Sequence, residues 1–76
     1  MRLSSYQQHV AFRNKDGLAC LADREAKGYE YPLISINGEF ETGQLIQLGL
    51  VAAEMVEGKR HLHLTDAGRA ALAACK

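Results

Sequence analysis

The clearest pattern in the chain predicts a β-hairpin in its C-terminal half. Apolar residues recur at every second position of residues 51–56 and again of residues 61–64, a period typical of strands. A two-residue turn between the runs fits on Glu57-Gly58 or on Gly58-Lys59. Either turn places the same side chains on one face, which we expect to be buried: Val51, Ala53, Met55, Leu62 and Leu64.

A helix is predicted on each side of this hairpin. From Glu39 to about Leu48, apolar residues follow a helical pattern, and Glu39 and Glu41 suit the positive end of a helix dipole. Gly49 then marks the end of that helix. After the hairpin, Thr65 is placed to cap a closing helix whose thin apolar face consists of Ala67, Ala71, Leu72 and Cys75.

Two further helices are expected in the first third of the chain. Ser4 or Ser5 is a suitable cap for a helix that runs to about Asn14. The Asp16-Gly17 pair then interrupts the pattern, and Asp16 is placed to cap a second helix. That helix is expected to end at Gly28, because glycine readily adopts the left-handed conformation that closes a helix.

The segment before the third helix is expected to contain a short edge strand. Apolar residues alternate within residues 29–36, but Pro32 interrupts them, and proline restricts a strand to an edge or to its first residue. Asn37-Gly38 is a strong turn signal. We therefore predict a strand over residues 33–36, followed by a turn.

These elements predict a single domain over residues 1–76, of the α+β class, with three helices plus a C-terminal β-hairpin and a closing short helix. The composition is that of a folded chain, with 47% hydrophobic and 24% charged residues. Nine basic and nine acidic side chains give a formal charge of zero. This balance counts against a general nucleic-acid binder, which usually carries a basic excess. Zero net charge also removes a barrier to self-association as a homodimer.

The protein is expected to be cytoplasmic and to have no contact with a membrane. Its first residues contain no apolar stretch of the kind that directs secretion. Its most apolar segment, residues 45–56, is too short to span a bilayer. Cys20 and Cys75 have no paired spacing, and we interpret both as reduced, mostly packed thiols.

The C-terminal half resembles winged-helix transcription regulators of the MarR and PadR type. The run LIQLGLV at residues 45–51, the hairpin after it and LTDAGRAAL at residues 64–72 follow the order found in those families. There, a recognition helix precedes a two-stranded wing, and the next helix starts with leucine-threonine-x-x-glycine-arginine. The resemblance covers residues 40–73 and implies a DNA-binding regulator in which Arg69 anchors the wing to the last helix.

Two features differ from the family pattern. Gly28 and Glu39 are separated by about ten residues, whereas the family joins the recognition helix to the preceding helix by a tight turn. In addition, Glu39 and Glu41 lie where a recognition helix enters the major groove, and residues 39–56 contain no lysine or arginine. Carboxylates at that place are repelled by phosphates, although a glutamate can accept a hydrogen bond from cytosine N4.

The candidate nucleic-acid-binding residues lie on the third helix and on the wing. Thr42, Gln44 and Gln47 are the uncharged polar groups of the helix, and glutamine can pair bidentately with adenine. Lys59 and Arg60 make the wing basic beside its turn, where wings commonly touch the DNA backbone. The alternative for both sets is an ordinary solvated surface.

Neither a metal site nor a catalytic site is predicted. His61 and His63 share a face of the wing with Glu54, and these residue types are suitable zinc ligands. A polar, solvent-facing strand is the better explanation. The sequence contains no glycine-rich phosphate loop, nucleophile elbow or C-x-x-C motif. We therefore expect no cofactor, and we do not expect an enzyme.

Two functions follow as expectations. The first is a small winged-helix module that binds DNA and regulates transcription. The second is a winged-helix adaptor that binds a protein partner through the acidic third helix and does not bind DNA, since fold alone does not determine function. A positive surface around the third helix and wing would favour DNA, whereas an acidic or apolar surface would favour a protein partner.

Overall fold

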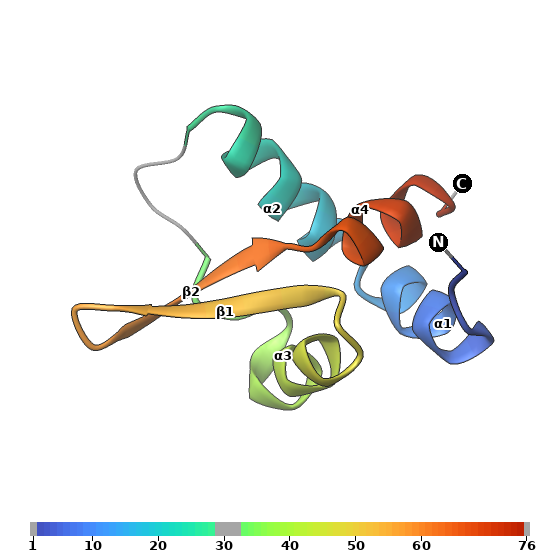
Figure 1. Ribbon diagram of the computed structural model, residues 1–76, viewed down its shortest axis with the longest axis horizontal. Coiled ribbons are helices and arrows are strands. Elements are labelled where there is room, and N and C mark those ends of the chain that lie inside the picture. The colour runs from blue at the N-terminus through green and yellow to red at the C-terminus, as the bar shows by residue number, and fades with distance from the viewer. Residues whose placement is uncertain (1, 29–32, 76) are drawn as a thin grey trace.

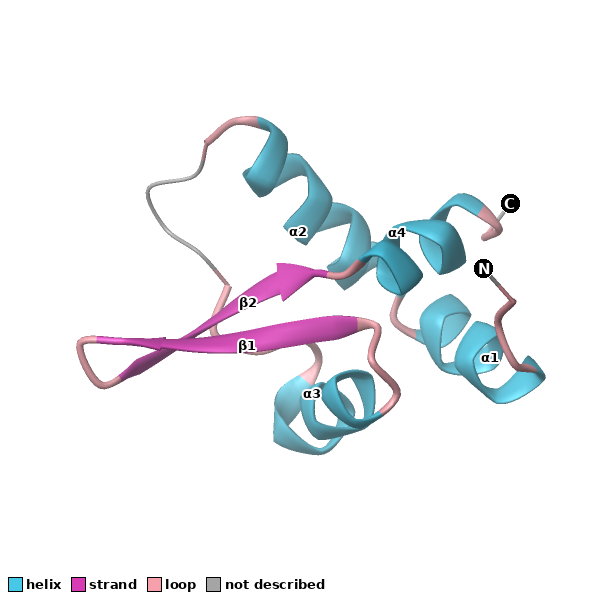
Figure 2. Ribbon diagram, in the orientation of Figure 1, coloured by secondary structure: helices cyan, strands magenta, loops and turns pink. Residues whose placement is uncertain are grey.

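The computed structural model describes residues 2–28 and 33–75. In these stretches the chain forms four α-helices and one antiparallel hairpin (Figure 1; Figure 2), namely α1 (Ser5–Arg13), α2 (Lys15–Ala26), α3 (Gly38–Gln47), β1 (Val51–Val56), β2 (Lys59–Leu64) and α4 (Asp66–Ala73). Figure 1 shows α1 and α4 near the base of the hairpin, with its turn at the opposite end of the molecule. The predicted α+β class, with helices, a β-hairpin and a closing helix in this order, is confirmed.

The two strands of the hairpin are joined by a two-residue turn at Glu57-Gly58. Both turn residues have positive φ values, 52° and 79°, as a type I′ turn requires. The turn pairs Val56 with Lys59, and the strands then remain in register as far as Val51 and Leu64. The predicted hairpin is confirmed, in the first of its two alternative registers.

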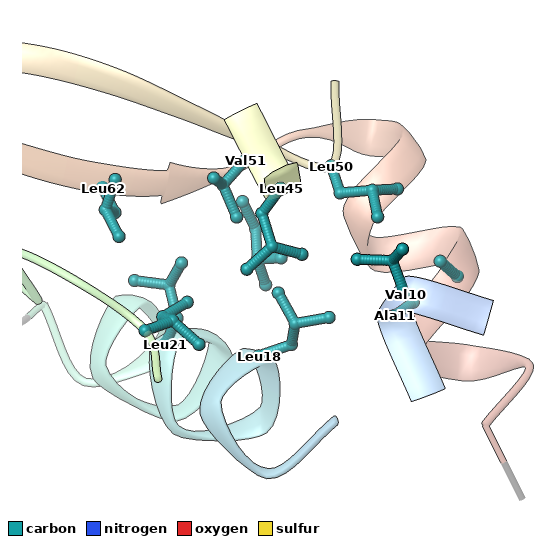
Figure 3. Close-up of a cluster of buried hydrophobic side chains, with 11 residues drawn as sticks. Val10, Ala11, Leu18, Leu21, Leu45, Leu50, Val51 and Leu62 are labelled. Atoms are coloured by element: carbon teal, nitrogen blue, oxygen red, sulfur yellow. The ribbon is translucent and has the colours of Figure 1, made fainter. Parts of the chain in front are cut away.

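The core lies between one face of the hairpin and the helices. All six elements contribute buried apolar side chains, which point toward one another (Figure 3). These side chains, together with those of the connecting segments, are Val10, Ala11, Leu18, Leu21, Ile36, Leu45, Leu50, Val51, Leu62, Leu64 and Ala71. Full burial stabilises by roughly 1.5–3 kcal/mol for each valine- or leucine-sized side chain, so this cluster is the main source of stability.

The predicted burial of Met55 and Ala53 is wrong. Val51 and Leu62 are buried as predicted, and they lie nearer the base of the hairpin, where the helices cover it. Met55 is paired with Arg60 close to the turn, and Figure 1 shows this end of the hairpin extending beyond the helices. The Met55 side chain is therefore 66% exposed, although it belongs to the face that is buried further along the strands.

The predicted cap of α1 is confirmed at Ser4. Its hydroxyl accepts a hydrogen bond from the N–H of Gln7 (3.0 Å), and the Gln7 side chain accepts one from the N–H of Ser4 (2.8 Å). This reciprocal pair is a capping box, which satisfies two N–H groups that a helix start leaves without partners. The helix ends at Asn14, also as predicted.

The predicted start of the second helix is wrong. α2 begins directly after Asn14, so that Asp16 lies in its first turn and does not cap it. Gly17 lies inside α2, where an added Cβ would collide with the side chain of Ile36. The close approach of the segment before α3 explains this glycine, because no larger residue fits there. At the other end, Gly28 closes the helix with a φ of 63°, as predicted.

The predicted strand over residues 33–36 is wrong. Within residues 33–75 this segment is irregular, and a single backbone hydrogen bond, from the N–H of Leu62 to the carbonyl of Leu33 (3.0 Å), joins it to β2. Ile36 is buried against α2 and cannot continue along the hairpin edge. The part of this prediction that concerned Pro32 and residues 29–31 lies outside the described residues.

The predicted end of α3 and the predicted start of α4 are confirmed. α3 ends at Gln47 with Leu48 as its C-cap, and Gly49 follows with a φ of 73°. Thr65 caps α4: its hydroxyl accepts a hydrogen bond from the N–H of Gly68 (2.9 Å) and donates one to the carbonyl of Gly49 (2.6 Å). At Gly68 an added Cβ would collide with the carbonyl oxygen of Leu50. The start of α4 is therefore held tightly against the start of β1.

The expectations about the cysteines are confirmed only in part. Cys75 is half-buried, with its sulfur 3.2 Å from the carbonyl oxygen of Ala71, whereas Cys20 is exposed and not packed as expected. Both are free thiols. Among residues 2–28 and 33–75, no helix is long and apolar enough to cross a membrane.

Candidate nucleic-acid interface

The outer face of α3 is an uncharged stripe. Phe40, Gln44 and Gln47 are spaced four and three residues apart, so they follow one another along one side of the helix. Phe40 is 74% exposed, Gln47 is exposed and Gln44 is half-buried. Thr42 and Leu45 are buried on the opposite side. We call Phe40, Gln44 and Gln47 the outer stripe.

Thr42 is not part of this surface. Its side chain is fully buried, and its hydroxyl accepts a hydrogen bond from the N–H of Ile36 (2.8 Å) and lies 2.7 Å from the carbonyl oxygen of Gly38. The hydroxyl therefore holds the chain that leads into α3. The sequence prediction grouped Thr42 with the two glutamines by polarity, but the helix turns it inward, out of reach of an external partner.

Gln44 is in contact with α1. The hydroxyl of Tyr6 donates a hydrogen bond to Oε1 of Gln44 over 3.1 Å. Nearby, Nε2 of Gln7 donates to the carbonyl of Leu48 over 2.9 Å. These two bonds hold α1 alongside the C-terminal half of α3. Gln44 is consequently the member of the outer stripe whose side chain is anchored to another element.

Glu41 is turned toward α1 and is held there by two side chains. Nδ2 of Asn14 lies 2.8 Å from Oε1 of Glu41, and Nε of Arg13 lies 2.9 Å from the same oxygen. The hydrogen bond from Asn14 is the larger cause, and that from Arg13 the second, of a Glu41 pKa below its ordinary value. Glu41 is therefore firmly ionised at neutral pH, and its charge is balanced by Arg13.

Glu39 is turned the opposite way, toward the hairpin. Nη1 and Nη2 of Arg60 donate to its two carboxylate oxygens over 3.0 and 2.6 Å, and Nε of Arg60 donates to the carbonyl of Ile34 over 2.8 Å. This forked bond lowers the pKa of Glu39 and raises that of Arg60. Arg60 therefore connects β2, the segment before α3 and the first turn of α3.

The five predicted contact residues are thus divided among four environments. Gln44 and Gln47 lie together on the outer stripe, and Thr42 is buried beneath it. Lys59 is exposed beside the hairpin turn, whereas Arg60 reaches back to Glu39. Among them, only the two glutamines form one continuous surface on α3, with Lys59 on the separate projection of the wing.

Of the two histidines of the wing, His63 contacts a carboxylate, that of Glu54. Glu54 is opposite His61 in the hairpin, but its Oε1 lies 3.3 Å from Nε2 of His63. Within residues 2–28 and 33–75, no group of three or more histidine, cysteine, aspartate or glutamate side chains is arranged to hold a metal ion.

Glu25 joins the wing to two helices. One of its carboxylate oxygens accepts the N–H of Leu64 (2.8 Å), and the other accepts Nη2 of Arg69 (2.9 Å). The resemblance implied that Arg69 anchors the wing to the last helix. In the structure, Arg69 of α4 makes this connection through Glu25 of α2, which bonds the end of β2.

Sequence reasoning missed Tyr6, Asn14 and Glu25 as members of this arrangement. Their contacts join residues 38, 27 and 39 positions apart in the chain. Local patterns carry no information on such contacts, and from the sequence Asn14 was predicted only as the end of a helix. A fold was needed to bring these side chains to α3 and to the wing.

Comparisons with known proteins reveal no relative. No protein-family model matches the chain, and no curated protein or solved structure matches it either. The relationship to winged-helix regulators therefore stays a prediction, based on residues 40–73 and on the order of helix, hairpin and helix.

Proposed function

We propose that this protein is a small winged-helix module that binds DNA and regulates transcription in the cytoplasm. The observation that carries the proposal is the outer stripe of α3, where Phe40, Gln44 and Gln47 form an uncharged surface along one side of the helix. A recognition helix reads bases in the major groove through side chains placed in this way. Glutamine amides pair with base edges, and a phenylalanine ring can contact the methyl group of thymine.

The positions of the two glutamates support this proposal. Glu39 and Glu41 lie on either side of the outer stripe, and each is paired with an arginine from another element. A paired carboxylate repels a phosphate less than an unpaired one, because the nearby positive charge opposes its field. The acidic start of α3 is therefore a smaller obstacle to DNA than the sequence alone indicates.

Among the described residues of α3 and the hairpin, one cation, Lys59, remains to contact the phosphate backbone. Arg13 and Arg60 are engaged with glutamates, and Lys59 is the exposed cation next to the hairpin turn. Each neutralised phosphate contributes about 0.9 to the slope of log affinity against log salt. We therefore expect a modest affinity and a shallow salt dependence.

Fluorescence anisotropy with labelled duplexes of mixed sequence, at several salt concentrations, tests this proposal. Lys59→Ala should weaken binding to every sequence and reduce the salt slope by about one. Lys27→Ala is the matched control, because it removes the same charge at the far end of α2, where Lys27 pairs with Asp23. It should leave binding unchanged. Failure of the wild-type protein to bind any duplex at low salt would overturn the proposal.

A second candidate function is that of an adaptor for a protein partner. The observation that favours it is apolar exposure near the start of α3 and on the wing, where Phe40 is 74%, Met55 66% and Ile34 52% exposed. Arg60 links these segments, since it is opposite Met55 in the hairpin and bonds both Ile34 and Glu39. Exposed aromatic and methionine side chains are enriched in protein interfaces.

Capture experiments from a host lysate separate the two candidates. A protein retained by the wild type and lost with Phe40→Ser and Met55→Ser would support the adaptor. Phe12→Ser is the control, because Phe12 is also half exposed but lies on α1 beneath the ammonium group of Lys15. DNA retention together with the absence of any captured protein would exclude the adaptor.

A further inference from the structure

The two long edges of the hairpin differ in what covers them. On β2, the N–H groups of Leu62 and Leu64 point away from β1 and donate to the carbonyl of Leu33 (3.0 Å) and to the carboxylate of Glu25 (2.8 Å). On β1, residues 52–56 are all exposed, and no backbone hydrogen bond joins their outer side to a described residue. We call the side of residues 52–56 that faces away from β2 the open edge.

The open edge presents the backbone groups of Ala53 and Met55. Residues of an antiparallel pair alternate between those that bond the other strand and those whose N–H and C=O point away from it. Ala53 is opposite Leu62, whose N–H points away from β1, so the N–H and C=O of Ala53 point away from β2. Met55, two residues further along, repeats this orientation. These two residues therefore offer the donors and acceptors that an added strand bonds.

β1 lacks the features that usually protect such an edge. Residues 51–56 read VAAEMV, without proline or lysine, and their pairing with β2 is continuous, without a bulge. The side chains of Ala52 and Ala53 are single methyl groups, which leave the backbone accessible. Figure 1 shows the part of β1 next to the turn extending beyond the helices. The open edge is therefore accessible to an incoming strand.

A second copy of this chain is a poor match for the open edge. A two-fold symmetric antiparallel pairing of two strands is centred on one residue. A centre at Ala53 pairs Met55 with Val51 of the second copy, and Val51 is only 2% exposed. A centre at Glu54 places two carboxylates directly opposite each other, where like charges repel, and a centre at Met55 requires the turn residue Glu57, whose φ of 52° is not that of a strand. A segment of a different protein avoids all of these conflicts.

The side chains beside the open edge indicate the chemistry of that segment. On one face Met55 is 66% exposed, and an apolar residue opposite it would remove its surface from water. On the other face the side chain of Glu54 is 63% exposed and lies 3.3 Å from Nε2 of His63, whereas Glu39 and Glu41 are each paired with an arginine. A lysine or arginine opposite Glu54 would form a favourable cross-strand pair.

We propose that the open edge binds an extended, antiparallel segment of another protein in which a lysine or arginine lies between two apolar residues. The two apolar residues exchange backbone hydrogen bonds with Ala53 and Met55, and the basic residue between them faces Glu54. The inference does not depend on DNA binding, because the open edge is on β1 and the outer stripe is on α3. It gives the adaptor candidate a definite class of partner.

NMR titration with synthetic peptides tests the inference. The probe is an acetylated and amidated Thr-Val-Lys-Val-Thr peptide, and the matched peptide has glutamate in place of lysine. With the lysine peptide, the backbone amide signals of Ala53 and Met55 should shift, and the affinity should exceed that for the glutamate peptide by about fivefold. Glu54→Lys should reverse this preference. An unchanged preference in Glu54→Lys, or shifts confined to residues outside β1, would overturn the inference.

The role of the backbone is tested on both partners. Methylation of the two valine nitrogens of the peptide removes its donors and should weaken binding to the wild-type protein by about tenfold. Ala53→Pro removes a donor from the open edge, where proline is tolerated in a strand, and it should also weaken binding. Ala53→Val keeps the N–H and is the matched control. Equal affinities for the methylated and unmethylated peptides would overturn the inference, whatever the stability of the proline variant.

Sedimentation equilibrium distinguishes the occupants of the open edge. Any self-association of the wild type should be unchanged in Ala53→Pro. A wild-type dimer that dissociates in Ala53→Pro but not in Ala53→Val would assign the edge to a second copy and overturn the proposal of a foreign segment. Failure of every peptide to bind at up to about 1 mM would overturn it as well. Because the titrations contain no DNA, neither result bears on the proposed binding of duplexes.

Discussion

Asn14 and Thr42 are the buried polar residues of the described chain, and both hold α3. The amide nitrogen of Asn14 donates to the carbonyl of Val10 (2.9 Å) and to Glu41 (2.8 Å), and its oxygen accepts from Asn37 (2.6 Å). A buried polar group stabilises a protein only while its partners are present, because an unsatisfied group keeps the full cost of its desolvation. Single residues with several partners are therefore the sensitive points of this fold.

Asn14→Ala should lower the free energy of unfolding by about 1–3 kcal/mol, since Glu41 and Asn37 lose a buried partner. Chemical denaturation measures this change. Arg13→Ala is the comparison, because it removes the other contact to Glu41 at a more exposed place, where an ion pair contributes little. A larger loss for Arg13→Ala than for Asn14→Ala would contradict the assignment of Asn14 as the main anchor.

Thr65→Ala should cost about 0.5–2 kcal/mol without a change of fold, because α4 loses the hydroxyl that caps it. Thr65→Ser retains that hydroxyl and should keep most of the stability. Thermal unfolding of the three proteins makes the comparison. If the serine variant were as unstable as the alanine variant, the cap would not be the reason for the loss.

Among the elements, the hairpin is covered at its base and open at its end. Leu62 is fully buried by the helices, whereas Met55, on the same face, is mostly in solvent. The contribution of a strand residue to stability therefore depends on its distance from the turn as much as on the face it occupies.

Leu62→Ala should lower the free energy of unfolding by about 2–5 kcal/mol, because it leaves a cavity in the core. In a domain of this size, that loss would unfold much of the population. Met55→Ala is the matched variant on the same face, and it should stay within about 0.5 kcal/mol of the wild type. Hydrogen exchange adds a second measurement: an unprotected amide at Leu62 would contradict the hydrogen bond to Leu33.

Glu39→Gln combined with Glu41→Gln should tighten binding to mixed-sequence DNA. The change removes two negative charges and releases Arg60 and Arg13, which then become available to phosphates. Asp23→Asn is the control, because it releases a cation, Lys27, at the far end of α2. If α3 instead docks on a basic protein surface, the same double variant should slow association and weaken its salt dependence. DNA retention and partner capture on the same samples distinguish these results.

Elements with strong local signals could be predicted from the sequence, and those set by distant contacts could not. The hairpin turn, Gly49 and Thr65 act through neighbours a few residues away, and their predictions were correct. Gly17 was mistaken for a helix break, because the residue that leaves no room for a Cβ at this position is Ile36, nineteen residues later in the chain. The same limit applies to the site: the two glutamines could be predicted as surface groups, but not the contact of Gln44 with Tyr6.

For the whole molecule, zero net charge conceals an ordered arrangement of charges. Within residues 2–28 and 33–75, different elements are joined by the arginine–carboxylate pairs of Arg13 with Glu41, Arg60 with Glu39, and Arg69 with Glu25. Two of them meet at α3 from opposite sides. Part of the charge balance in the sequence therefore comes from side chains that pair with one another. The net charge consequently does not describe the charge of the surface that a partner would meet. Self-association as a homodimer stays a prediction.

Acid should destabilise the fold through the two glutamates of α3. Their pKa values in the folded protein lie below the ordinary value of 4.5, so their contribution is fully present above about pH 4.5 and is lost as the pH falls through the lowered values. Urea denaturation between pH 7 and about pH 3 measures this loss. The double variant Glu39→Gln with Glu41→Gln should lose less stability over the same window. Identical curves for the two proteins would contradict the assignment.

Gly17 and Gly68 have a consequence for anyone who redesigns this scaffold. Helix propensity favours alanine over glycine by up to about 1 kcal/mol. Propensity alone would therefore suggest a glycine-to-alanine substitution at both positions to stabilise the helices. At both, however, the added carbon would push apart two segments that are now in contact, α2 from Ile36 and α4 from Leu50. Gly43 is the position for such an exchange, because an added Cβ there meets nothing within 4 Å.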